Sequence, residues 1–104
     1  MKTHFLKTWP VFFSAVLASR KTFEIRNDDR EFEEGDTIVL QEWSPEEAKK
    51  SPNNPSAGYT GKPDIRGSIS YVLLASDCPS GALAQGFAVL GVNWDIRVTA
   101  TRQA

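Results

Sequence analysis

A hydrophobic stripe with helical spacing runs through the first part of the chain. Its main members recur at intervals of three or four positions, which indicates a helix that packs one face against a core. Thr8 is a suitable N-cap, and Pro10 fits the first turn, where its missing N–H is not needed. We therefore predict one main N-terminal helix, preceded by a short strand over 4–6. The residues predicted to face the core are Trp9, Phe12, Phe13, Val16 and Leu17.

After the helix the hydrophobic pattern changes to a period of two. Phe23 and Ile25 alternate with Thr22, Glu24 and Arg26, which predicts a half-buried strand with Phe23 in the core. A helix followed by short strands predicts an α+β fold, and strands this short favour a closed or nearly closed β-barrel. Further β-prone runs cover residues 37–43, 66–74, 86–92 and, as a candidate tail strand, 95–101.

A long segment rich in proline, asparagine and glycine, residues 44–64, separates two of the predicted strands. Ser44 followed by Glu47 is a capping-box pattern, so we predict a single helical turn through Ala48. The remainder is predicted to be loop, and a loop of this length in a small domain is usually functional or mobile. The length of the chain, 104 residues, is that of one domain.

Composition and charge exclude several classes of function. The chain has 12 Lys and Arg against 13 Asp and Glu, so it lacks the bulk positive charge of a protein that coats nucleic acid. It has one cysteine, Cys78, and one histidine, with no metal-ligand spacing, so we expect no metal and no cofactor. The apolar run 9–18 is too short and interrupted for a membrane span or signal peptide. We expect a cytoplasmic monomer.

The clearest candidate chemistry lies between Lys21 and Arg30. Strand alternation places Glu24 and Arg26 on one face, with Lys21 where the strand begins and Asp29 in the turn that follows. The cations can contact phosphate, arginine in a bidentate manner, while Glu24 can orient a cation or accept hydrogen bonds from a base or ribose. The alternative is a salt-bridge network that only holds the turn in place.

The segment 19–26 resembles the signature of the ASCH domains, a branch of the PUA-like barrels. That signature is Gly, any residue, Lys, two of any kind, Glu, any residue and Arg, at the junction of a helix and a strand. The resemblance covers nearly the whole chain, more weakly after residue 74, and is to a subgroup of small bacterial and phage proteins. Further matching positions are His4, Leu6, Lys7, Pro10, Asp29, Arg30, Glu31, Phe32, Gly35, Asp36, Glu42, Trp43, Tyr59, Thr60 and Gly61.

The resemblance implies a small PUA-like β-barrel of about five to six mostly antiparallel strands with one main N-terminal helix. It also implies a cleft at the helix–strand junction that suits RNA or a nucleotide. Two positions depart from the family. Ser19 stands where the signature has glycine, and Glu24 stands where ASCH amidohydrolases carry a threonine nucleophile. The amidohydrolase activity is therefore not transferred to this chain.

Three hypotheses of function follow. The first is an RNA- or nucleotide-binding domain, whose ligand is its main partner. The second is a hydrolase on RNA or a modified nucleoside, with Glu24 as general acid or base and Lys21 stabilising negative charge. The third is a phage-related module that binds another protein through an exposed strand or the long loop. The candidate binding residues, whose aromatic members could stack on unpaired bases, are Lys7, Lys21, Glu24, Arg26, Asp29, Arg30, Trp43, Tyr59, Thr60 and Tyr71.

Overall fold

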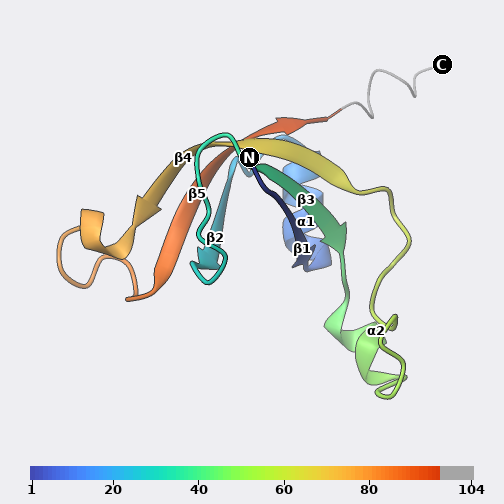
Figure 1. The fold of residues 1–104 in the computed structure, drawn as a ribbon. Coiled ribbons are helices and arrows are strands. Elements are labelled where there is room, and N and C mark those ends of the chain that lie inside the picture. The colour runs from blue at the N-terminus through green and yellow to red at the C-terminus, as the bar shows by residue number, and fades with distance from the viewer. Residues whose placement is uncertain (97–104) are drawn as a thin grey trace.

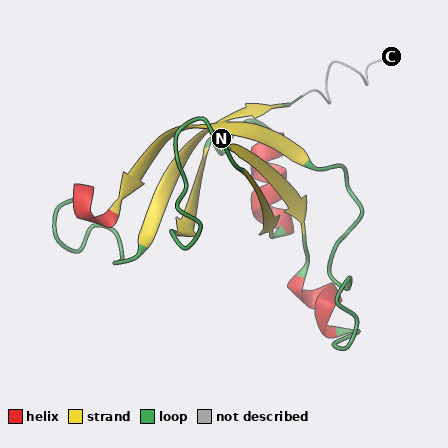
Figure 2. Cartoon of the chain, viewed as in Figure 1, coloured by secondary structure: helices red, strands yellow, loops and turns green. Residues whose placement is uncertain are grey.

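Residues 1–96, which the computed structural model describes, build one curled sheet with the main helix beneath its arch (Figures 1 and 2). None of the helices in this part of the chain combines the length and the apolar character that a membrane crossing requires. The strands are β1 (Thr3–Thr8), β2 (Phe23–Asn27), β3 (Thr37–Glu42), β4 (Ile65–Leu74) and β5 (Phe87–Asp95). The helices are α1 (Pro10–Leu17), α2 (Pro45–Lys49) and the 3₁₀ turn η1 (Ala75–Asp77).

The strand order in the sheet is β1-β3-β4-β5-β2. β1 and β3 are parallel, and the other three neighbouring pairs are antiparallel. The prediction of an α+β fold with mostly antiparallel strands and one main helix is therefore confirmed. The closed or nearly closed barrel is a wrong prediction, because β1 and β2 remain the outer strands of an open half-barrel in the described chain. The predicted tail strand begins in β5, and its residues 97–101 lie outside the described part.

The core lies between the inner face of the sheet and α1. β1 alternates regularly, with His4, Leu6 and Thr8 buried and the residues between them exposed. α1 contributes Phe13 and Val16, both fully buried as the helical stripe predicted. Burial of such side chains contributes roughly 1.5–3 kcal/mol each. The buried apolar cluster consists of Leu6, Phe13, Val16, Phe32, Ile38, Leu40, Ile65, Ile69, Ala88, Leu90 and Val92.

The start of α1 differs from the prediction by one residue. Its N-cap is Trp9 and not Thr8, and Pro10 occupies the first helical position. Trp9 has an extended backbone, with φ −63° and ψ 149°. Its side chain therefore does not follow the helical periodicity that its spacing from Phe13 suggested.

The end of α1 has the two hydrogen bonds of a Schellman motif. The Ser19 N–H donates to the Val16 carbonyl, and the Arg20 N–H donates to the Ala15 carbonyl, both at 2.9 Å. Ser19 has φ +62°, a left-handed conformation that favours glycine. The position at which the ASCH signature carries glycine is thus one that needs a positive φ in this chain.

We expect Ser19→Gly to raise the free energy of unfolding by about 0.5 kcal/mol. Relief of the left-handed backbone, at about 1–2 kcal/mol, outweighs the extra freedom of glycine in the unfolded chain. Urea denaturation followed by circular dichroism measures the change. Ser14→Gly, the same substitution inside the right-handed helix, is the control and should cost roughly 0.5 kcal/mol. A loss of stability in both variants would contradict the argument.

Candidate functional site

Strand β2 presents its two faces in the opposite sense to the prediction. Glu24 is buried, with 3% of its surface exposed, whereas Phe23 and Ile25 are 43% and 53% exposed. Glu24 is aligned with Leu90 of the core across the β2–β5 pair, so it shares the inner face of the sheet. The prediction of Phe23 as a core residue is therefore wrong. The polar residues of the alternation face inward because Glu24 pairs with cations on that face of the sheet.

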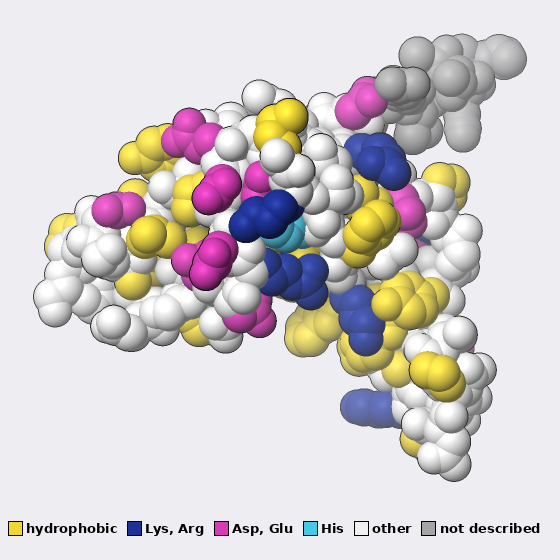
Figure 3. Space-filling view, in the orientation of Figure 1, with side chains coloured by type: hydrophobic (Ala, Val, Ile, Leu, Met, Phe, Trp, Pro, Cys, Tyr) yellow, Lys and Arg dark blue, Asp and Glu magenta, His cyan; other side chains and the backbone are white. Residues whose placement is uncertain are grey.

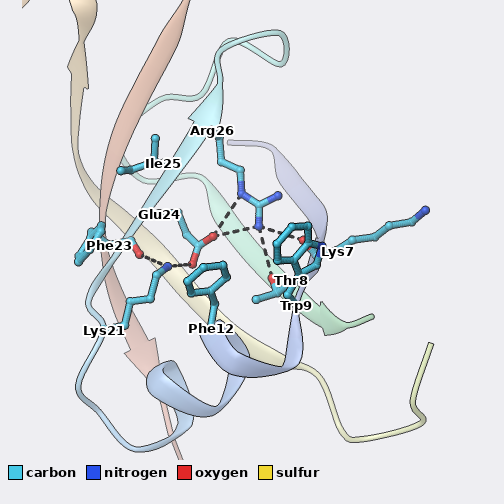
Figure 4. Close-up of a pocket in the computed structure, with 9 residues that line it drawn as sticks. All are labelled: Lys7, Thr8, Trp9, Phe12, Lys21, Phe23, Glu24, Ile25 and Arg26. Carbon is cyan, nitrogen blue, oxygen red and sulfur yellow. Dashed lines mark hydrogen bonds and ion pairs between the residues drawn. The ribbon is translucent and has the colours of Figure 1, made fainter. Parts of the chain in front are cut away.

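Two cations hold the Glu24 carboxylate. Lys21 Nζ lies 2.6 Å from Oε2, and Arg26 donates to Oε1 from Nη2 at 2.9 Å and from Nε at 3.2 Å (Figure 4). Lys21 also donates to the Phe23 carbonyl at 2.6 Å. We call Lys21, Glu24 and Arg26 the charged floor. Its formal charge is one positive unit, because two cations share one carboxylate.

Arginine side chains bridge the two outer strands of the half-barrel. Arg26 Nη2 donates to the Lys7 carbonyl at 3.1 Å and to Thr8 Oγ1 at 3.3 Å, and Arg30 Nη1 donates to the Phe5 carbonyl at 2.9 Å. Carbonyls on the free edge of a sheet need hydrogen-bond donors from outside the ladder. Arg26 thus joins β2 to the end of β1 while it also pairs with Glu24.

A pocket of about 410 Å³ opens between these bridged strands, over the charged floor. Trp9 and Phe12 of the α1 start stand beside the floor, as Figure 4 shows, with their ring centroids 6.2 Å apart and nearly parallel. They are 53% and 46% exposed, so the prediction that they face the core is wrong. The residues that line the pocket are Lys7, Thr8, Trp9, Phe12, Lys21, Phe23, Glu24, Ile25 and Arg26.

The side chain of Lys7 points away from the pocket toward a second aromatic group. Its ammonium lies 4.7 Å from the ring centroid of Trp43 and 5.8 Å from that of Tyr59. Thr60 donates from its hydroxyl to Glu42 Oε1 at 2.5 Å, beside the same group. The structure therefore brings Lys7, Trp43 and Tyr59 together next to the pocket, although they come from three separate segments of the chain.

Trp43 anchors the long loop to the end of β3. Its indole N–H donates to the Ala57 carbonyl at 3.1 Å, and its backbone forms a β-bridge with Tyr59. Gly58, with φ +99°, packs so close that a Cβ there would lie 2.3 Å from the Trp43 Nε1. Ser44 caps α2 by accepting from Glu47 N at 3.2 Å, which confirms the predicted helical turn. Much of segment 44–64 is thus held by defined contacts.

Two other candidate residues lie apart from the pocket. Asp29 is exposed in the turn after β2. Tyr71 of β4 is aligned with Gly91, which is aligned with Phe23, so Tyr71 lies on the outer face of the sheet, opposite to Glu24. Tyr71 is 57% exposed there. The sheet therefore separates Tyr71 from the charged floor.

Sequence reasoning did not name five of the residues that line the pocket. They are uncharged, and the sequence pattern assigned four of them to the helix stripe or the β2 alternation and Thr8 to the helix N-cap. A usable signal was the placement of Trp9 beside Pro10, since a residue at an N-cap lies outside the helical stripe. The five residues are Thr8, Trp9, Phe12, Phe23 and Ile25.

Charge is unevenly distributed over the face seen in Figure 3. Lysine and arginine side chains gather at its centre and toward the lower right, next to hydrophobic side chains, and most acidic side chains lie to their left. Within residues 1–96, no three His, Cys, Asp or Glu side chains converge as metal ligands would. The pocket itself combines the cations Lys21 and Arg26 with exposed aromatic rings, which suits a flat, anionic ligand.

Comparisons with known proteins match most of the chain to one family model. A family described as "Domain of unknown function (DUF3850)" has a model that matches residues 3–92. The chain is also similar to the "Uncharacterized 12.9 kDa protein in GpA 3'region" of Escherichia phage P2, with 43% identity over 42 residues. That alignment covers 40% of this chain and 38% of the phage protein. The chain thus has a phage relative, as the sequence predicted. The alignment covers well under half of the length of the phage protein.

Proposed function

We propose that the chain, which belongs to the DUF3850 family of domains of unknown function, binds RNA or a nucleotide in the pocket between β1 and β2. The observation that supports this most is the stacked, exposed pair Trp9 and Phe12 beside the charged floor. A base can stack on an exposed aromatic ring, at roughly 1–3 kcal/mol per base. Leaving large aromatic rings exposed to water in the folded protein is unfavourable, so a patch of such rings indicates a binding surface.

The charged floor supports the anionic part of the ligand. Its excess of one positive charge attracts a phosphate. Lys21, Glu24 and Arg26 are the charged positions of the ASCH-like signature, and all three line the pocket. The chain as a whole is nearly neutral, so this local excess is what selects an anion. We accordingly propose a PUA-like, ASCH-type domain with its ligand site at the helix–strand junction.

Binding is favoured over hydrolysis by the contacts of Glu24. Each of its carboxylate oxygens already accepts from a cation, Oε2 from Lys21 and Oε1 from Arg26. A general base needs an oxygen that can reach the proton it removes in the bound substrate. Glu24 instead orients the two cations and limits their net charge, which is a task of a binding site.

Titration of the protein with short single-stranded RNAs at 50 and 200 mM salt tests the proposal. For each phosphate contact, we expect the rise from 50 to 200 mM salt to weaken RNA binding by about two- to threefold. Trp9→Ala should weaken binding by about tenfold, because it removes the stacking ring and leaves the backbone of the N-cap unchanged. Fluorescence anisotropy measures both effects.

Val11→Ala is the matched control for this titration. Val11 is 66% exposed on the same helix and does not line the pocket, so its truncation should leave RNA affinity unchanged. Equal affinities for the Trp9→Ala and wild-type proteins would refute the proposal. So would an absence of binding, at the lower salt concentration, both of RNA and of 5′-mononucleotides.

A further inference from the structure

Lys7 connects the pocket to the second aromatic group. Its backbone borders the pocket, where its carbonyl accepts from Arg26, and its side chain extends to the rings of Trp43 and Tyr59. Figure 4 shows this side chain leading away from the other pocket residues. β1 is an outer strand, so this path runs around a free edge of the sheet. The second aromatic group thus lies about one lysine side chain away from the border of the pocket.

The second aromatic group is held in place before any ligand arrives. Tyr59 pairs with Trp43 through a backbone β-bridge, and the Ser44 N–H donates to the Gly58 carbonyl at 2.7 Å. The Thr60 N–H donates to the Glu42 carbonyl at 3.3 Å, on the other side of Tyr59. A residue whose backbone is fixed in this way loses less freedom on binding, which lowers the entropic cost of a contact.

Tyr59 is the ring of this group that is open to a ligand. Trp43 is half-buried, with Gly58 packed against its indole and its N–H bonded to the loop. Tyr59 is 43% exposed, and the Lys7 ammonium lies beside it. An exposed ring with a neighbouring cation offers a base a stacking surface and offers its phosphate a counter-charge.

We propose that the ligand is a strand of single-stranded RNA with at least two nucleotides, one base in the pocket and the next on Tyr59, with Lys7 contacting the phosphate between them. This inference rests on the proposed function and narrows it, because a free nucleotide fills only the pocket. Tyr59 and Lys7 form a second base position outside the ASCH-like signature. They contribute affinity for an RNA strand and none for a mononucleotide.

Comparison of two probes tests the second base position. The first probe is the set of four homopolymeric tetraribonucleotides, and the second is the set of matching 5′-mononucleotides, each titrated by calorimetry or competition. We expect the preferred tetranucleotide to bind at least tenfold tighter than its mononucleotide. Tyr59→Ala should remove about tenfold of tetranucleotide affinity and leave mononucleotide affinity unchanged, whereas Trp9→Ala should weaken both.

Two further variants control this experiment. Tyr59→Phe keeps the ring and should retain the tetranucleotide affinity, while Tyr71→Ala removes a more exposed ring on the outer face and should change neither affinity. The inference is refuted if Tyr59→Ala leaves tetranucleotide binding unchanged or weakens both probes equally. Failure of the proposed function gives a different result: neither probe binds the wild-type protein, or Trp9→Ala affects neither. In that case both proposals fail.

Discussion

Replacing Glu24 with alanine is expected to lower the free energy of unfolding by about 3 kcal/mol, a large part of the stability of a small domain. The Glu24 side chain is 4% exposed, and those of its partners Lys21 and Arg26 are 16% and 25% exposed. Removal of the carboxylate leaves two cations side by side in a poorly hydrated place. Because both cations retain some contact with water, we expect the loss of stability to lie at the lower end of the range known for broken buried ion pairs.

Urea denaturation of Glu24→Ala measures this loss, and Glu47→Ala is its matched control. Glu47 pairs with Lys50 at 3.0 Å, but the two side chains are 58% and 70% exposed. An ion pair in water contributes little, so the control should lose no more than about 1 kcal/mol. Glu24→Gln, which keeps the shape and one acceptor, should fall between the two. Equal losses in Glu24→Ala and Glu47→Ala would show that burial does not strengthen the Glu24 pairs.

The elements that sequence predicted correctly are those fixed by local chemistry. Ser44 caps α2 through a contact with Glu47, three residues away, so the capping pattern carries its own geometry. The same holds for Pro10, which occupies the first helical position of α1, in the first turn where its missing N–H is not needed. Such contacts depend on neighbours in the chain and need no knowledge of the tertiary fold.

Which face of a strand points inward is not a local property. The alternation of β2 is equally compatible with Phe23 inside or Glu24 inside, since a period of two fixes only that they differ. Burial of Glu24 is supported by Lys21, which lies between α1 and β2, and by Arg26, which also bridges to the end of β1. The bridge from Arg26 to β1 forms only when the sheet curls so that β2 approaches β1.

The residues of the site show the same difference between what local spacing predicts and what depends on the tertiary fold. The signature residues Lys21, Glu24 and Arg26 lie within one short segment, and sequence spacing placed them together correctly. Tyr59 and Tyr71 are both aromatic residues in β-rich surroundings, yet one lies beside Lys7 and the other lies on β4, aligned with Gly91 of β5. The β-bridge between Trp43 and Tyr59 decides this, and no sequence spacing reports it.

Protonation of Asp36 is expected to destabilise the fold as the pH falls from about 4 to 2. Burial alone would raise the pKa of Asp36, but hydrogen bonds from Lys2 N, His4 Nε2 and Glu33 N outweigh it and lower the pKa from 3.8 to about 2. A carboxyl whose pKa is lower in the folded state stabilises the protein above its unfolded pKa. That stability, about 2 kcal/mol here, is lost as the pH falls through the folded pKa.

Asp36→Asn isolates this contribution, because its side chain does not titrate. Asparagine has one carbonyl oxygen, so it cannot accept at both Oδ1 and Oδ2 from donors 2.8–3.1 Å away. At pH 7 we expect the variant to lose at least about 2 kcal/mol, measured by urea denaturation. The difference from the wild-type protein should shrink toward pH 2, whereas the exposed control Asp64→Asn should show no such change. A difference that stays constant from pH 7 to 2 would mean that Asp36 titrates alike in both states, and the hydrogen bonds from Lys2, His4 and Glu33 would then not favour its charged form.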